Sequence, residues 1–349
     1  MEHRPINLAS DNTAGAHPEV MRALADAAAT PAMPYGDDPW TARLQERAAA
    51  AFEHPLAIYP VGTGTAANAL ALATLVPSWG VVLCHHAAHV EEDECAAPEF
   101  YSGGAKLALM DGENGRISAD SLAARLDFAT PAPRVHRAQP AAVSITQSTE
   151  SGTVYGLDEV RDISAVCRQH GLALHMDGAR LANAVAALGC SPADITWRSG
   201  VDVLSLGATK NGALCAETVV FFDTGLCDEF EFRRKRGGHL FSKMRFASAQ
   251  MVPWLEEGRW IRLAEHANRM AVELADGLAG IPGITLQFPV ETNMIFLDLP
   301  VATSGALARA GCLFYSWGER DGRVSARLVT SFETTREDVA HVIDTARAG

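Results

Sequence analysis

Short apolar runs rich in β-branched residues alternate along the chain with longer segments whose apolar residues recur at helical spacing. Such runs are typical of strands, and their alternation with helices favours an α/β fold with a mainly parallel sheet. We predict seven strands before residue 224: AIYPV (57–61), VVLCH (81–85), KLALM (106–110), AAVSITQ (141–147), LALHMD (172–177), DVLSLGA (202–208) and TVVFFD (218–223).

The clearest predicted helix is DEVRDISAVCRQHG, which opens with acidic residues and stops at a glycine, as helix ends prefer. Residues 243–280 are also predicted to be mostly helical. We expect Pro253, Gly258 and Gly277 to interrupt this segment, because proline lacks a backbone donor and glycine is a poor helix former.

The pattern changes after residue 280, where the predicted elements are shorter. They are the strands ITLQF, NMIFLDL and SARLVTSF, a short helix after the second of these, and a final helix, TREDVAHVIDTARA. A chain of 349 residues that is 48% hydrophobic is long enough for more than one core. We therefore predict a large domain over residues 1–250 and a small α+β domain over residues 251–349.

The formal net charge of -13 repels nucleic acids and anionic membranes, so neither is an expected partner. One basic run, RRKRGGH (233–239), departs from this balance, and its simplest interpretation is a solvated helix end. Seven cysteines occur singly, with no C-x-x-C, which argues against a disulfide framework. MEHRPINLAS lacks the features of a signal peptide, and apolar stretches such as LALATLV are short of the ~20 residues that span a bilayer. We expect a protein of the reducing cytoplasm.

Polar clusters follow several predicted strands, and ligands of such sheets bind beyond the carboxyl ends of strands. In VGTGTAAN, Gly62 and Gly64 would let the backbone approach an anion, and the helix start supplies free N–H groups. Thr63 and Thr65 add hydroxyl donors. The stretch matches neither the P-loop nor the Rossmann fingerprint, so a plain strand-to-helix turn is the alternative.

LHMDGAR places Asp177 at the end of an apolar strand, where a carboxylate needs a cation or strong donors. One interpretation is a salt bridge between Asp177 and Arg180. The other is that Asp177 faces a protonated heterocycle, which leaves the Arg180 fork free to bind a carboxylate.

Lys210 stands at the end of the apolar run LSLGATK, although this chain otherwise prefers arginine. Of the 29 basic residues four are lysines, at positions 106, 210, 235 and 243. Apolar surroundings disfavour an ammonium, and a neutral lysine amine forms Schiff bases with aldehydes, as arginine cannot. Lys210 comes 33 residues after Asp177 (210 − 177), so the two are predicted to end neighbouring strands. The alternative is a lysine that extends to the surface.

CHHAAHVEEDE carries His85 and His89 at a spacing that allows a metal site, but without a third placed ligand we predict no metal. His89 at a strand end can instead stack on an aromatic ring or transfer protons. The acids that follow it are predicted to form a helix N-terminus.

A Schiff-base lysine, a strand-end aspartate and a helix start suited to phosphate together indicate pyridoxal phosphate (PLP). At this point the chain resembles the low-specificity L-threonine aldolases and the related phenylserine aldolases, in order from about residue 8 to residue 336. The matching stretches are LASDN, YGDDPW, GTGTAAN, AAHVEEDECAAPEF, MDGARLANA, LGATKNG, KMRFASAQ and ARLVTSFET.

The resemblance implies the aminotransferase fold type I of PLP-dependent enzymes. This fold has a mainly parallel seven-stranded large domain and a small α+β C-terminal domain. It also implies a homodimer or homotetramer with shared active sites. The expected partners are a β-hydroxy-α-amino acid, glycine and an aldehyde.

For the cofactor, the resemblance implies that Lys210 forms the Schiff base and that Asp177 pairs with the pyridine nitrogen. Gly64 and Thr65 match the phosphate-binding pair, and His89 matches a histidine that stacks on the ring.

For the substrate, the resemblance implies that Ser10, Arg180 and Arg327 hold the carboxylate. Tyr35 matches a loop near the neighbouring subunit's site, and the basic run around Arg234 matches a region that sends a cation to the partner's phosphate.

One departure concerns TESGT, where many threonine aldolases carry a second active-site histidine and this chain has Glu150. Glu150 or His89, directly or through water, is therefore the candidate base for the substrate hydroxyl.

The expected activity is reversible cleavage of L-threonine, L-allo-threonine or related amino acids, including phenylserine, to glycine and an aldehyde. The alternatives are another PLP enzyme of this fold, such as a racemase, transaminase or β-eliminating lyase, and a non-catalytic PLP-binding protein.

Overall fold

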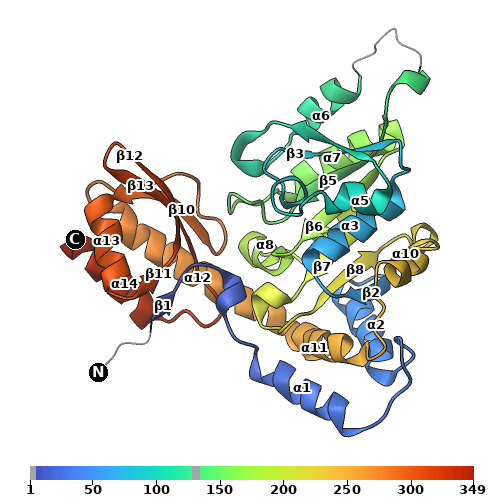
Figure 1. Ribbon diagram of the computed structural model, residues 1–349, viewed down its shortest axis with the longest axis horizontal. Helices are drawn as coiled ribbons and strands as arrows, with labels where there is room; N and C mark the ends of the chain where they lie inside the picture. The colour runs from blue at the N-terminus through green and yellow to red at the C-terminus, as the bar shows by residue number, and fades with distance from the viewer. Residues whose placement is uncertain (1–4, 128–133) are drawn as a thin grey trace.

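The computed structural model describes residues 5–127 and 134–349, which form two lobes (Figure 1). The larger lobe surrounds a seven-stranded sheet, and the smaller lobe contains the C-terminal sheet. Helix α12 (Arg259–Ala279) runs between them. The short N-terminal strand β1 (Ile6–Asn7) lies in the smaller lobe, whereas the next helix, α1 (Pro18–Ala29), lies at the far edge of the larger one.

All seven predicted strands of the large sheet are confirmed, with ends shifted by no more than two residues. The strand order is β2-β8-β7-β6-β5-β3-β4, and only β8 runs antiparallel to its neighbours. The sheet is therefore mainly parallel, as predicted. The strands are β2 (Ala57–Val61), β3 (Gly80–His85), β4 (Lys106–Met110), β5 (Gln139–Thr146), β6 (Ala173–Gly178), β7 (Val203–Gly207) and β8 (Glu217–Phe221).

Helices cover both faces of this sheet (Figure 1). The predicted helix DEVRDISAVCRQHG is α7 (Leu157–His170), which ends at Gly171 in the left-handed region with φ 67°. The basic run falls in the last turn of α10, as the interpretation of a helix end requires. The other helices of the large lobe are α2 (Pro39–Ala51), α3 (Gly64–Leu75), α4 (His89–Glu92), α5 (Ala97–Ser102), α6 (Ala119–Leu126), α8 (Leu181–Leu188), α9 (Pro192–Ile195), α10 (Phe230–Arg236) and α11 (Arg245–Leu255).

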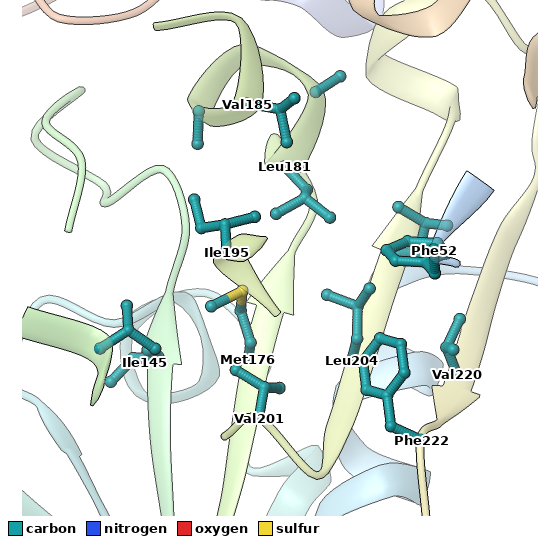
Figure 2. Close-up of a cluster of buried hydrophobic side chains, with 14 of the residues drawn as sticks. Phe52, Ile145, Met176, Leu181, Val185, Ile195, Val201, Leu204, Val220 and Phe222 are labelled. Atoms are coloured by element: carbon teal, nitrogen blue, oxygen red, sulfur yellow. The ribbon is translucent and has the colours of Figure 1, made fainter. Parts of the chain in front are cut away.

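The central strands are held by one large apolar cluster (Figure 2). Figure 2 shows Met176 of β6 and Leu204 of β7 next to Leu181 of α8, and all three are excluded from solvent. Burial of such side chains stabilises each by about 1.5–3 kcal/mol. The cluster fixes the position of β6, so that the next residue, Asp177, stands at a defined strand end.

The smaller lobe contains an antiparallel sheet in the order β12-β13-β10-β9. One of its strands, β12, was not predicted, because all of its residues are exposed and it contains no β-branched or aliphatic residue. The N-terminal β1 pairs in parallel with β11, so Leu8 joins the core of this lobe. The elements are β9 (Thr285–Leu286), β10 (Met294–Pro300), α13 (Val301–Arg309), β11 (Cys312–Leu313), β12 (Tyr315–Arg320), β13 (Arg323–Val329) and α14 (Arg336–Ala348).

The predicted interruptions at Pro253 and Gly277 are wrong, since the two residues lie inside α11 and α12. The break occurs at Gly258, which has φ 66°. Pro253 lies two residues before the end of α11, and Gly277 lies where a larger residue would collide with Ile343 of α14. Core residues of both lobes come from α12, and the predicted domain boundary at residue 250 stays a prediction.

We predict that Gly277→Ala destabilises the protein, because the added Cβ would overlap Ile343. Overpacking costs about 1–3 kcal/mol, whereas alanine alone improves a helix by about 1 kcal/mol. In a protein that also carries Ile343→Ala, the same substitution should be neutral or stabilising. The midpoint of urea unfolding measures the stability of each variant. Gly280→Ala is the control, because no atom lies within 4 Å of its added Cβ. Equal effects at the two positions would contradict the packing argument.

Candidate active site

The polar strand ends meet in one cavity of about 320 Å³. Asp177 reaches it from the end of β6, and Lys210 from a 3-10 helix, η5 (Thr209–Asn211), just beyond β7. The turn between β2 and α3 lines it as well. The structure thus brings together the three predicted clusters, where ligands of such sheets bind.

The turn before α3 has the form of an anion-binding site. The hydroxyl of Thr63 caps the helix by accepting from the N–H of Ala66 at 3.1 Å. A Cβ at Gly62 would lie 3.0 Å from the Phe241 ring, so glycine lets this ring pack close to the backbone. Beyond it the helix starts at Gly64, and the first N–H groups of a helix have no acceptor within it. These groups are available to a phosphate.

Asp177 is buried and held by neutral donors. Its Oδ2 accepts from Asn68 Nδ2 at 2.8 Å, and its Oδ1 accepts from the N–H of Ala179 at 3.0 Å. The interpretation of Asp177 and Arg180 as a salt bridge is wrong, because Arg180 forms its ion pair with Asp11. Asp177 therefore keeps its charge for another partner in the cavity.

Arg180 and Asp11 form a two-point ion pair that is almost fully buried, with side chains 6% and 1% exposed. Nε of Arg180 donates to Oδ2 at 2.7 Å and Nη2 to Oδ1 at 3.0 Å. Burial alone would raise the pKa of Asp11, but the charge and hydrogen bonds of Arg180 hold it below its usual value. The prediction that the guanidinium of Arg180 is free is therefore wrong, because two of its nitrogens are bound to Asp11.

Arg327 of β13 lies beside this pair. Its Nη2 donates to the Ala9 carbonyl at 3.3 Å, and its Nε is buried without a hydrogen-bond partner in the described ranges. Burial lowers the pKa of Arg327, and the charge of Arg180 lowers it further. Ser10 follows Ala9 and borders Asp11. The three predicted carboxylate-binding residues are thus brought together at the junction of the two lobes.

His89 is bound to a carboxylate that the sequence did not single out. Its Nδ1 lies 2.8 Å from Oε1 of Glu94, which also accepts from Asn68 Nδ2 at 2.8 Å. The hydrogen bond to Glu94 raises the pKa of His89, and burial raises that of Glu94. Glu91 and Glu92 do open α4, as predicted, but Glu94 lies beyond its end. A continuous network runs from His89 to Asp177 through Glu94 and Asn68.

Ligand atoms of His89, Glu94 and Asp177 all lie within 4.8 Å of one another, close enough for a metal ion. The Asn68 amide, however, donates to both carboxylates, and its N–H groups face the position of a cation. His85 is not part of the group, because its two ring nitrogens bond the Gly112 carbonyl and the Ala87 N–H. The absence of a metal stays a prediction.

Glu150 lines the cavity, as predicted. Its charge acts on His89 from one side and on Arg180 and Arg327 from the other. Glu150 is therefore close enough to act on both the predicted ring-stacking residue and the predicted carboxylate site, as a group that acts on the substrate hydroxyl would need to be.

Arg234 does not line this cavity. It is 6% exposed, its Nε donates to the Pro60 carbonyl at 2.9 Å, and burial lowers its pKa to about 10. Its Nη2 is buried without a hydrogen-bond partner among the described residues, and the cation that this region sends to a partner's phosphate stays a prediction. Tyr35 lies away from this cavity, half exposed, with the ammonium of Lys235 4.5 Å from its ring centre. Its place near a neighbouring subunit's site stays a prediction.

Three residues of the cavity region were missed. Asn68 and Glu217 line the cavity, and His175 lies beneath it between Ser144 and Ser205, at 2.9 and 3.0 Å. Burial lowers the pKa of His175 to about 4, so this histidine is neutral. No spacing rule identifies these residues; a weak signal is a polar residue within an apolar strand, as His175 is in β6, or at its start, as Glu217 is in β8.

The comparisons with known proteins agree with this geometry. The beta-eliminating lyase family matches residues 7–301. The chain belongs to this family. A low specificity L-threonine aldolase from Pseudomonas aeruginosa is 46% identical over 94% of each chain, and one from Pseudomonas sp. is 44% identical over 100% of this chain and 99% of its own.

The solved structure of a threonine aldolase from Leishmania major matches this family member with a TM-score of 0.92 and 27% identity, over 99% of each chain. A serine palmitoyltransferase from Sphingomonas wittichii shares the fold with a TM-score of 0.73 and 14% identity, over 99% of this chain and 87% of its own. The predicted fold class is confirmed.

We predict that Glu94→Gln lowers the pKa of His89, because an amide replaces the carboxylate that stabilises the imidazolium. Histidine NMR titration measures the shift, with the His89 resonance assigned by a His89→Asn variant. Glu92→Gln, on the exposed side of α4, is the matched control and should leave the pKa of His89 unchanged. An unchanged His89 titration in Glu94→Gln would show that the hydrogen bond does not set its charge.

Proposed function

We propose that the protein is a PLP-dependent aldolase that cleaves L-threonine, L-allo-threonine or related amino acids, including phenylserine, reversibly to glycine and an aldehyde. The observation that carries the proposal is a single cavity that combines Lys210, Asp177 and the turn at Gly64 and Thr65. The names of the two Pseudomonas relatives, which match nearly the whole chain, support it.

The residues present fit PLP. Lys210 offers the amine for an aldehyde, Asp177 a buried carboxylate for a protonated pyridine nitrogen, and the start of α3 the N–H groups for a phosphate. The Oδ1 of Asn68 is buried without a hydrogen-bond partner among the described residues, as expected where a polar group binds. When bound, the cofactor accepts the electron pair of a bond broken at the α-carbon of an amino acid.

In this proposal Arg327 and Ser10 bind the substrate carboxylate. Arg180 contributes through Nη1, the nitrogen that Asp11 does not bind. A carboxylate fixed at this point determines which bond at the α-carbon is aligned for cleavage. These residues therefore select the reaction as well as bind the substrate.

We assign the removal of the substrate's hydroxyl proton to Glu150. His89 is the weaker candidate, because its Nδ1 is bound to Glu94 and the raised pKa favours its imidazolium form, which cannot accept a proton. Glu150 reaches the same cavity and has no protonated donor fixed to it in the hydrogen bonds of the described chain.

We propose that two or four copies assemble with shared active sites. The loop before α2 exposes Met33 and Tyr35, and Leu214 near the cavity is half exposed. Large apolar side chains exposed on one loop, as Met33 and Tyr35 are, support a surface that a partner covers. No helix of the described ranges is long and apolar enough to cross a membrane. We place the protein in the cytoplasm, where its free cysteines would stay reduced.

Beta-elimination is the second candidate, favoured by the family that the chain matches. A product assay separates the two reactions, because aldol cleavage gives glycine and an aldehyde, whereas elimination gives ammonia and a keto acid. The substrates to compare are L-threonine, L-allo-threonine and both phenylserine diastereomers. Keto acid without glycine would replace the proposed function.

Lys210→Arg should abolish the Schiff-base absorbance and aldehyde release while leaving the fold intact by circular dichroism, because a guanidinium does not condense with the cofactor. Borohydride reduction of the wild type, followed by peptide mapping, should place the cofactor on Lys210. Cofactor trapped on another residue would contradict the assignment.

Glu150→Gln should slow aldehyde release by about 10²–10⁴-fold, the usual contribution of a general base. Exchange of the α-proton of glycine with deuterated water, followed by NMR, should remain within a few-fold of the wild type, because that reaction involves no hydroxyl. The Lys210→Arg variant should lose both activities. An equal loss of cleavage and exchange in Glu150→Gln would show that this residue has another role.

A further inference from the structure

A second buried carboxyl group, besides Asp177, faces the cavity where we place the cofactor. Glu217 is the first residue of β8, lines the cavity and is 8% exposed. Its Oε2 lies 2.6 Å from the position of a Cβ built on Gly207 and 3.9 Å from one built on Gly64. The carboxyl group therefore lies beside the N-terminus of α3, at the point where a phosphate would bind.

The surroundings give this carboxyl group little to balance a negative charge. Burial raises the pKa of Glu217 to about 7, against hydrogen bonds from Thr209 and the charge of Lys210, which lower it. The charge of Asp177 raises it further. The adjacent elements α3 and β7 contain no charged residue. Lys210 is thus the cation that acts on Glu217, and the proposed Schiff base would engage that same amine.

A phosphate bound at the start of α3 would lie beside this carboxyl group. Two negative charges so close in a buried site repel each other, and one of the two groups then takes up a proton. A protonated carboxyl is a hydrogen-bond donor and so becomes a ligand for phosphate oxygens. A carboxylate, by contrast, would compete with the phosphate for the N–H groups of α3 and for Thr209.

Resting on the proposed function, we infer that Glu217 is a phosphate-binding residue that acts in its protonated form, so that binding of PLP above neutral pH takes up a proton. The sign follows from linkage. Well below pH 7 Glu217 is already protonated in the cofactor-free protein, so a change of pH there does not alter the affinity for PLP through this residue. Above pH 7 each further pH unit weakens binding by about tenfold, until the pKa of Glu217 in the complex is reached.

The direct test is the infrared spectrum of the holoenzyme at pH 8, with the side chains of glutamate labelled with ¹³C. A protonated carboxylic acid band that shifts on exchange into deuterated water should be present in the wild type and absent from Glu217→Gln. If Glu217→Gln does not fold, absence of any protonated glutamate band from the wild-type spectrum at pH 8 overturns the inference, and a band that persists in Glu94→Gln supports it.

The second test compares the dissociation constants of PLP and of pyridoxal, which lacks the phosphate, with the full-length apoenzyme between pH 6.5 and pH 8.5. Wild type should lose PLP affinity more steeply with pH than Glu217→Gln, by about tenfold per unit above pH 7. Pyridoxal should show no such difference between the two proteins. The control Asp223→Asn, an exposed acid beyond the other end of β8, should follow the wild type.

The binding measurements distinguish failure of the role assigned to Glu217 from failure of the proposed function. If PLP and pyridoxal bind but Glu217→Gln has the wild-type pH dependence for PLP, the role of Glu217 is wrong and the proposed function stands. If neither compound binds at any pH, the proposed function and the inference fail together.

Discussion

The buried ion pair between Asp11 and Arg180 ties together the parts of the chain that build the site. Asp11 belongs to the N-terminal segment, Arg180 immediately precedes α8 in the large lobe, and Asn293, which also donates to Asp11 at 3.1 Å, immediately precedes β10 in the small lobe. Neither charge is stable in this setting alone, because removal of one partner from a buried pair costs about 3–5 kcal/mol. The geometry of the carboxylate site therefore depends on this contact.

Three buried acids around the cavity differ because their neighbours differ. Asp177 receives two neutral N–H donors, Glu94 is bound by His89 and Asn68, and Glu217 has the weakest compensation, with a pKa of about 7. Differences of this kind let one fold keep one carboxylate charged while another carries a proton at the same pH. The chemistry of the cavity therefore depends on the neighbours that bind these acids as much as on the residues that face the ligand.

The inner strands of the large sheet, such as β7 and β8, were predictable because they are buried on both faces and read as continuous apolar runs. Because the positions of the strands also gave the positions of their carboxyl ends, Asp177 and Lys210 could be predicted to lie at the same edge of the sheet. The exposed strand β12 gave no such pattern. Roles for Ser10, Arg327 and Glu150 came from resemblance to a family, because their neighbours in space are distant in the sequence.

The errors have a common physical cause. Arg180 and Asp11 are 169 residues apart, and Glu94 meets Asp177 only through Asn68, so no local spacing reports these contacts. A short segment such as LHMDGAR suggests the nearest opposite charge as partner, whereas the fold supplies a better one. The basic run shows the same limit, since such a run indicates exposure and the fold buries one member of it, Arg234.

The charges at the junction of the lobes also suit a particular ligand. Asp11 forms an ion pair with Arg180, whereas Arg327 has no ion-pair partner among the described residues and keeps a buried Nε without a hydrogen-bond partner there. The proximity of Arg180 lowers the pKa of Arg327, so the two guanidinium groups repel each other until an anion arrives. A ligand with one carboxylate removes this repulsion and satisfies the open donor, whereas a second carboxylate would find no counter-charge at this point. The ion pair that stabilises the junction thus also limits the charge of the amino acid that binds there.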